Sequence, residues 1–236
     1  MQSSSPLIIS NQQEIHPNLD AVVMKHLTHP NQKPIAAHTR EAFDRLDQIV
    51  KSTSRPVVLD SCCGVGESTT QISKLHPEAL VIGLDKSAHR LAKGHAAGDF
   101  LFERVDLNDC WRLIADAHWP VTHHYLLYPN PWPKSKHLQR RWYAAPVFQA
   151  LLSIGGKLHI RTNWRIYIEE FARALTLAGY QTQVDAFISE RAWTPFERKY
   201  QQNGHELWQL DCNFKKKTLK DCHKQSLTSL ELTLDD

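Results

Sequence analysis

The sequence predicts an α/β fold in which a mostly parallel sheet carries helices on both faces. Short apolar stretches alternate with amphipathic stretches from residue 56 onward, as they do when helices cross over between parallel strands. Glycine, proline and asparagine mark the turns between these stretches. The last two strand candidates follow one another without a helical pattern between them, which predicts an antiparallel pair at one edge of the sheet.

The seven expected strands are short and bounded by turn residues, at 56–60, 80–84, 100–105, 122–128, 157–162, 181–189 and 206–214. The expected helices that connect or follow these strands span 67–75, 87–95, 109–117, 138–152 and 164–178. Ser87 is a candidate cap for the second of these helices, and Gly179 is expected to end the last one. Pro146 is expected to kink or split the helix at 138–152, because proline lacks a backbone donor.

The 236 residues are expected to form one domain with a flanking segment at each end. Residues 1–50 are an N-terminal extension, frayed up to about residue 15 and with one helix at 38–50 that Thr39 caps. Residues 51–214 form the main domain, and residues 215–236 are expected to be a disordered tail.

Composition argues against several classes of protein. No apolar run approaches the roughly 20 residues of a membrane helix, and the N-terminus lacks the pattern of a secretory signal, so we expect a cytoplasmic protein with no membrane partner. The five cysteines form no C-x-x-C pair and the fourteen histidines are scattered, so we expect reduced thiols and no metal site. The net charge of +3 permits a nucleic-acid partner, and the choice between monomer and homodimer stays open.

A cofactor loop is expected in LDSCCGVGEST, where the first strand meets the first helix of the alternating region. Gly64 and Gly66 allow the backbone to approach a ligand closely. Asp60 would repel a pyrophosphate, but it suits the ammonium and sulfonium groups of S-adenosylmethionine. Thr69 replaces the third glycine of the dinucleotide fingerprint. S-adenosylmethionine is therefore favoured, with a dinucleotide as the alternative.

Two further aspartates end the next two strands. Asp85 is placed to accept hydrogen bonds from ribose hydroxyls, and Asp106 from an adenine amino group. A single aspartate at a strand end is common in loops, which is the alternative interpretation. Three aspartates at successive strand ends favour a cofactor site, because open α/β sheets bind ligands at that edge.

The fourth strand leads into LLYPNPWPKSKHLQRRW, residues 126–142, where Lys134, Lys136, Arg140 and Arg141 place four cations within eight residues. Such clusters neutralise phosphates, whereas the alternative is a solvated basic face at a helix start. Cations are unfavourable at a helix N-terminus, so the cluster favours an external anion. Trp132 either stacks on a base or packs the loop.

This loop resembles that of bacterial tRNA (guanine-N7)-methyltransferases, F-P-D-P-W-x-K-x-R-H-x-K-R-R. The matching residues are Pro129, Pro131, Trp132, Lys134, His137, Arg140 and Arg141, with Lys136 for an arginine. RTNWRIY resembles the family's T-D-W-x-x-Y through Thr162, Trp164 and Tyr167, and TPFERKYQQNG resembles T-x-[FY]-E-x-x-x-x-x-x-G through Thr194, Phe196, Glu197 and Gly204. Order and spacing agree from about residue 56 to 214.

The resemblance implies a Rossmann-like class I methyltransferase fold and methyl transfer from S-adenosylmethionine to N7 of a guanine in tRNA. Asn130 is expected to lie between cofactor and base as the catalytic residue. The residues expected to hold the guanine are Lys134, Asn163, Thr194 and Glu197, and those expected to hold the RNA backbone are Lys136, His137, Arg140 and Arg141. The Glu197 carboxylate can accept from guanine N1–H and the 2-amino group, whereas its alternative role is a surface ion pair with Arg198 or Lys199.

The sequence departs from the family pattern at three positions. Asn130 and Asn163 replace aspartates, and Cys62 replaces the first glycine of the cofactor loop. Guanine N7 carries a lone pair and no proton, so its methylation needs no general base. Asn130-Pro131-Trp132-Pro133 also resembles the [DNS]-P-P-[YFW] loop of exocyclic-amine methyltransferases. Methylation of an exocyclic amine or a non-tRNA substrate, or tRNA binding without catalysis, are therefore the alternatives.

Overall fold

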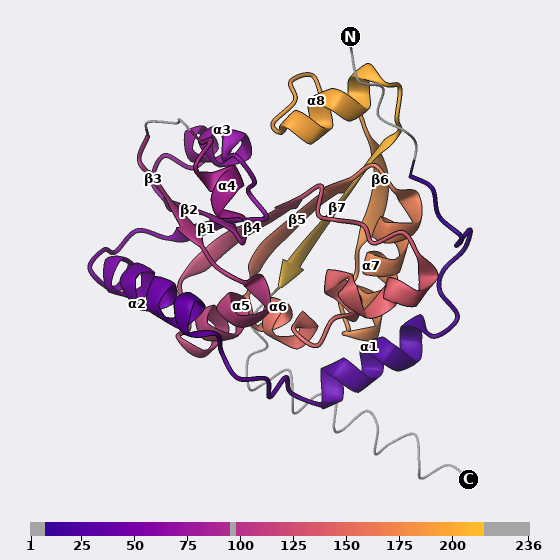
Figure 1. The fold of residues 1–236 in the computed structure, drawn as a ribbon, viewed down its shortest axis with the longest axis horizontal. Helices are drawn as coiled ribbons and strands as arrows, with labels where there is room; N and C mark the ends of the chain where they lie inside the picture. The colour runs from indigo at the N-terminus through magenta and orange to yellow at the C-terminus, as the bar shows by residue number, and fades with distance from the viewer. Residues whose placement is uncertain (1–7, 95–97, 215–236) are drawn as a thin grey trace.

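The computed structural model describes residues 8–94 and 98–214, and within them seven strands form one sheet in the order β3-β2-β1-β4-β5-β7-β6 (Figure 1). The strands are β1 Val57–Ser61, β2 Leu80–Asp85, β3 Phe100–Arg104, β4 Val121–Leu127, β5 Gly156–Thr162, β6 Gln183–Phe187 and β7 Leu207–Phe214. Strands β1 to β5 pair in parallel, and β7 is antiparallel to both of its neighbours. The prediction of a mostly parallel sheet with an antiparallel edge pair is confirmed.

The α-helices of the described part are α1 Leu19–Thr28, α2 Ala37–Lys51, α3 Glu67–Leu75, α4 Ala88–Leu91, α5 Leu107–Asp116, α6 Phe148–Ile154, α7 Arg165–Leu177 and α8 Pro195–Gln202. Two short 3-10 helices, η1 Ser135–Arg140 and η2 Trp142–Ala144, precede α6. No helix in the two described stretches is long and apolar enough to cross a membrane.

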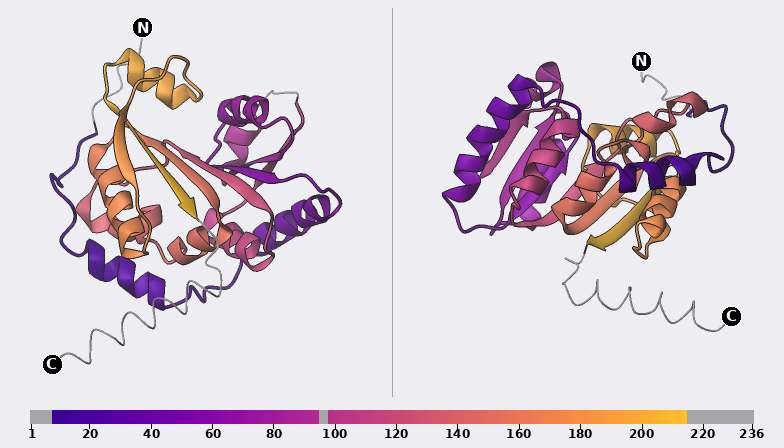
Figure 2. Two further views of the ribbon diagram at one scale, coloured as in Figure 1. Left: turned by 180° about the vertical axis from the view of Figure 1, so that it is seen from behind. Right: turned by 90° about the horizontal axis from the view of Figure 1, so that it is seen from below.

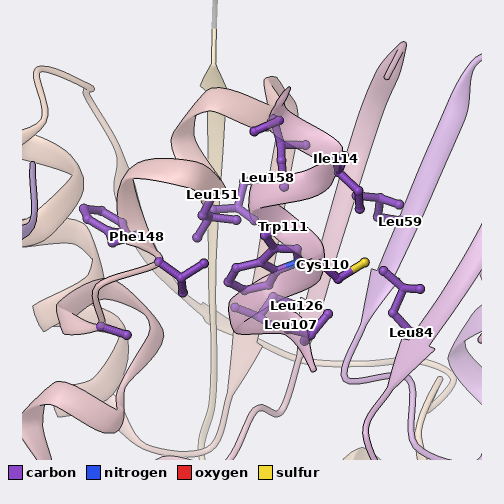
Figure 3. Close-up of a cluster of buried hydrophobic side chains, with 14 of the residues drawn as sticks. Leu59, Leu84, Leu107, Cys110, Trp111, Ile114, Leu126, Phe148, Leu151 and Leu158 are labelled. Atoms are coloured by element: carbon purple, nitrogen blue, oxygen red, sulfur yellow. The ribbon is translucent and has the colours of Figure 1, made fainter. Parts of the chain in front are cut away.

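The two faces of the sheet are covered unequally, as the two views of Figure 2 show. Alternate strand side chains point to opposite faces, so Leu59 joins the larger core with α5 while Val58 joins a smaller core with Ile72 of α3. Figure 3 shows the larger core, where Trp111 of α5 lies among aliphatic side chains such as Leu126 of β4. Apolar side chains on both faces of the sheet therefore pack helices against both faces. The loops that connect strands to helices are left at the ends of the strands.

Two helical expectations have opposite outcomes. The segment at 138–152 is split, as expected from Pro146, which lies between η2 and α6 and cannot donate within a helix. The expectation that no helix separates the last two strands is wrong, because α8 lies there. Its sequence, PFERKYQQ, is too polar to show an apolar stripe, although Thr194 and Pro195 are ordinary helix-start residues.

The N-terminal region is more ordered than expected. The amphipathic helix α1, which the sequence reading missed, buries Leu19 and Val23 and contacts α7. Thr39 does not cap α2; it lies within this helix, and its hydroxyl accepts from the Asp106 N–H at 3.1 Å. Residues 10–16 are hydrogen-bonded to distant parts of the chain and are not frayed. The expected tail at 215–236 lies outside the described residues.

Candidate active site

Three aspartates meet at the carboxyl edge of the sheet, as expected from the parallel strand order. Asp60 belongs to β1, Asp85 ends β2, and Asp106 follows β3 as the N-cap of α5. The strands β3, β2 and β1 are adjacent in the sheet, so these carboxylates follow one another along its edge. We call this part, with the loop from β1 to α3, the cofactor half of the edge.

Asp60 is the most deeply buried of the three, at 1% exposure. Its Oδ2 accepts from the hydroxyls of Ser68 (2.7 Å) and Thr69 (2.6 Å), at the start of α3. Its Oδ1 is buried without a hydrogen-bond partner. Burial raises the pKa of Asp60 to about 6, although the two hydroxyls lower it. An unsatisfied buried acceptor of this kind fits a cationic ligand group.

The cofactor loop turns through left-handed backbone at three positions. Gly64 has φ 62° and Gly66 has φ 81°, and a Cβ at Gly66 would lie 2.2 Å from the Phe102 ring. Cys62 adopts φ 65°, so this cysteine stands at a position that favours glycine and carries backbone strain. Burial raises the pKa of the Cys62 thiol to about 12, which keeps it protonated.

Asp85 and Asp106 also hold the backbone around them. Asp85 accepts from the Gly64 N–H at 3.0 Å and the Ser87 N–H at 2.8 Å, and it pairs with Arg90 at 3.1 Å. Asp106 Oδ1 accepts from both the backbone and the side-chain amide of Asn108, each at 2.9 Å. Ribose and adenine contacts would therefore add to existing bonds, using the remaining lone pairs of these carboxylates.

The loop after β4 carries the predicted catalytic residue. Asn130 is exposed, and its Oδ1 accepts from the Trp132 N–H at 3.1 Å, which closes a tight turn. Tyr128 at φ 50° and Trp132 at φ 48° flank this turn in left-handed backbone. Two non-glycine residues in left-handed backbone thus lie on either side of one exposed amide, and such strain is held in place only by the structure around it.

The basic residues that follow separate into two groups. Lys134, Lys136 and Arg140 are exposed, and the Arg140 guanidinium lies 4.8 Å from the centre of the Trp132 ring, which His137 meets edge-on from another side. Because their side chains are exposed, these cations are accessible to an external anion.

Arg141 does not belong to this surface, and its assignment to the RNA-facing set is corrected. Its side chain is fully buried, and it pairs with the equally buried Glu170 of α7 at 2.6 Å. It also donates to Gln12 at 2.9 Å and to the Trp132 carbonyl at 3.2 Å. The Arg141 guanidinium has no exposed surface and is engaged by these internal partners, so it directs no donor to a phosphate backbone and instead holds the loop after β4 against α7.

Residues 10–16 cross this region and bind the same loop; we call them the N-terminal strap. Ser10 donates to the Pro133 carbonyl at 2.6 Å, and Asn11 accepts from the Ser135 N–H at 3.0 Å. Gln12 donates to Glu170 at 2.5 Å. Sequence reasoning missed the strap because polar N-terminal residues carry no pattern that identifies a remote partner.

The remaining predicted substrate residues lie at β5 and α8; we call the loop after β4, the strap that binds it and these two segments the substrate half of the edge. Asn163 follows β5 and contacts His205 at 3.2 Å, and Thr194 caps α8 by accepting from the Glu197 N–H at 2.9 Å. Glu197 is fully buried, with its Oε2 3.5 Å from Arg161. Arg198 pairs instead with Glu67 at 2.6 Å. The alternative of a surface ion pair at Glu197 is therefore wrong.

Arg161 was missed among the residues of this half. The sequence signal was present, because an arginine at the end of a buried strand needs an acceptor.

Across the two described stretches, no group of three or more histidine, cysteine, aspartate or glutamate side chains is arranged to hold a metal ion.

Comparison with known proteins gives consistent relatives. The sequence pattern of a family described as "Putative methyltransferase" matches residues 54–210. A tRNA (guanine-N(7)-)-methyltransferase from Pseudomonas syringae pv. tomato is 31% identical over 176 residues, which cover 66% of this chain and 70% of the relative. One of the same name from Pseudoalteromonas atlantica is 29% identical over 171 residues, covering 66% and 71%.

Solved structures share the fold at low sequence identity. The 16S rRNA methyltransferase KamB superposes with a TM-score of 0.52 at 17% identity, covering 73% of this chain and 94% of that one. A variant of the 16S rRNA (adenine(1408)-N(1))-methyltransferase from Catenulisporales acidiphilia, solved with SAM, has a TM-score of 0.51 at 17% identity and covers 72% and 90%. Both structures are similar to this chain in fold.

Proposed function

The chain belongs to the tRNA (guanine-N7)-methyltransferase family as a divergent member, and from that premise we propose that it transfers the methyl group of S-adenosylmethionine to N7 of a guanine in tRNA. The observation that carries the proposal is the β4 loop. It presents three exposed cations, Lys134, Lys136 and Arg140, from the same sheet edge that holds the Asp60 carboxylate. In this proposal the protein acts in the cytoplasm on tRNA.

The cofactor half supports S-adenosylmethionine rather than a dinucleotide. The unpartnered Oδ1 of Asp60 would accept from the ammonium group, and its negative charge would favour the cationic cofactor. Gly64 and Gly66 carry no side chains, so the loop backbone could approach the cofactor closely. Asp85 would contact the ribose and Asp106 the adenine. The residues present therefore fit this group.

The reaction places modest chemical demands on the side chains. S-adenosylmethionine, when bound, supplies an electrophilic methyl group. Guanine N7 has a free lone pair and no proton, so Asn130 needs to align the base and does not need to remove a proton. The hydrogen bond that Trp132 N–H donates to Asn130 Oδ1 holds the amide in the loop, where it would contact both ligands. Alignment is then the main source of rate.

The substrate half supplies the tRNA contacts. Lys134, Asn163, Thr194 and Glu197 would hold the guanine, and Lys136, His137 and Arg140 would hold the RNA backbone. Arg141 acts indirectly, through Glu170, by holding the loop after β4, which carries Lys134, Lys136, His137 and Arg140.

The test is methyl transfer from labelled S-adenosylmethionine to bulk tRNA, followed by mass spectrometry of nucleosides. Label in 7-methylguanosine is the expected result. Label in a nucleoside with a methylated exocyclic amine would overturn the choice of N7. If cofactor binds but no tRNA is labelled, catalysis on tRNA is excluded; activity gained only in Asn130→Asp would then mark a tRNA-binding protein that has lost catalysis.

A further inference from the structure

Three buried polar atoms without hydrogen-bond partners cluster at the substrate half. They are the Tyr128 hydroxyl, the Arg161 Nη1 and the Glu197 Oε1. The Tyr128 N–H donates to the Arg161 carbonyl at 2.8 Å, and Arg161 Nη1 lies 3.5 Å from Glu197 Oε2. The end of β4, the end of β5 and helix α8 therefore bring the three groups to one place.

Such a cluster is costly unless something completes it. Buried polar groups in native proteins nearly always have partners, and one left unsatisfied loses the hydrogen bonds it had with water. Here Glu197 Oε1 can only accept, Arg161 Nη1 can only donate, and the Tyr128 hydroxyl can do either. The missing partner is thus a group that presents an acceptor beside a donor.

The donor side of this cluster is rigidly held. The Arg161 guanidinium lies 4.1 Å from the centre of the Phe187 ring and 4.3 Å from that of the Trp193 ring. A guanidinium packed against two rings has restricted motion, which favours recognition of a flat ligand over a flexible one. The Tyr128 ring packs against Tyr200, with ring centroids 5.7 Å apart.

We propose that Arg161 and Tyr128 read the O6 atom of the target guanine while Glu197 accepts from its N1–H. This inference rests on the proposed function and adds two specificity-determining residues to it. O6 and N1–H are neighbours on one edge of guanine, so an acceptor and a donor lie side by side as the cluster requires. Adenine presents an amino donor in place of O6, and Arg161 would then face a donor with a donor.

The test compares guanosine with 6-thioguanosine at the mapped target position of a ligated tRNA. The thione is the weaker acceptor, and it leaves N1–H, the 2-amino group and N7 in place. The native protein is expected to lose about tenfold in kcat/KM on the thio substrate. Arg161→Met is expected to lose on the order of 10- to 100-fold on guanosine and to show little further loss on the thio substrate.

Two further variants keep the test decisive. Tyr128→Phe removes a single oxygen and should reduce both the rate on guanosine and the sensitivity to sulfur, even if Arg161→Met folds poorly. Arg165→Met is the matched control, because Arg165 is exposed and pairs with Glu169. It should retain both the rate and the thio effect.

The outcomes separate the two levels of the proposal. If the thio effect is equal in the native protein and in both site variants, Arg161 and Tyr128 have a structural role and the inference is wrong. If the native protein methylates no tRNA guanine at N7, the proposed function fails, and the reading of O6 fails with it.

Discussion

The two halves of the carboxyl edge are held together by different kinds of contact. In the cofactor half, Asp60 binds hydroxyls 8 and 9 residues away, and Asp85 binds a backbone amide 21 residues away. In the substrate half, Ser10 reaches Pro133 across 123 residues and Gln12 reaches Glu170 across 158. One half is a local motif, whereas the other is an assembly of distant segments. We therefore expect changes in the first half to affect cofactor binding and changes in the second to affect stability and loop position.

The largest effect on cofactor binding is expected for Asp60→Asn, which should weaken S-adenosylmethionine binding by roughly 100-fold because the ammonium group loses a buried charged partner. Calorimetric titration would measure it. In the native protein, binding should weaken as the pH falls through about 6, where Asp60 becomes protonated.

The same variant should be more stable than the native protein at pH 8. Burial raises the folded-state pKa of Asp60, so the protonated carboxyl favours the folded state. This stabilisation is fully present below about pH 4 and is lost as the pH rises through about 6. Above that pH the buried charge costs about 2–3 kcal/mol, which asparagine avoids. Unchanged binding together with a lower melting temperature would contradict both statements.

Arg141→Met is expected to have the largest effect on stability, a loss of roughly 3–5 kcal/mol in the free energy of unfolding that lowers the melting temperature by about 10 °C. It leaves the buried Glu170 carboxylate without its ion-pair partner. Arg140→Met is the matched control, since Arg140 is exposed. It should leave stability nearly unchanged and reduce the salt dependence of tRNA binding by about one counterion. Equal melting temperatures of the two variants would show that Arg141 is not held as described.

Gln12→Ala tests the strap directly. It removes the amide that joins Glu170 and Arg141, at a cost of about 1–3 kcal/mol. The rate on tRNA should fall while affinity for S-adenosylmethionine stays the same. Met24→Ala, at an exposed position on α1, serves as the control. A parallel loss of cofactor affinity would mean that the two halves are not independent.

The smallest effect is expected for Cys62→Gly, which relieves left-handed strain and should stabilise the protein by about 1 kcal/mol. Cys62→Ala keeps the strained backbone and should not stabilise it. Thermal melts of the two variants, compared with the native protein, measure the difference. A gain in both would point to the sulfur atom rather than to the backbone.

The contrast between local and long-range contacts also explains which features of the structure could be predicted from the sequence. The strand and helix alternation and the three aspartates could be predicted because each depends on neighbours in the chain. Arg141 was misassigned because nothing in KHLQRRW distinguishes the arginine that faces Glu170 from the one that faces solvent. Helix α8 was missed because its polar sequence is stabilised by a cap and by its place at the sheet edge.

The long reach of the strap also bears on the order in which the protein forms during synthesis. The N-terminal residues leave the ribosome first, but Glu170, which Gln12 contacts, is made 158 residues later. The Asp60 contacts with α3 can form soon after that helix emerges, since only 8 or 9 residues separate the partners. A nascent chain would thus acquire its cofactor loop early and complete the contacts that hold the loop after β4 only after α7 has been translated.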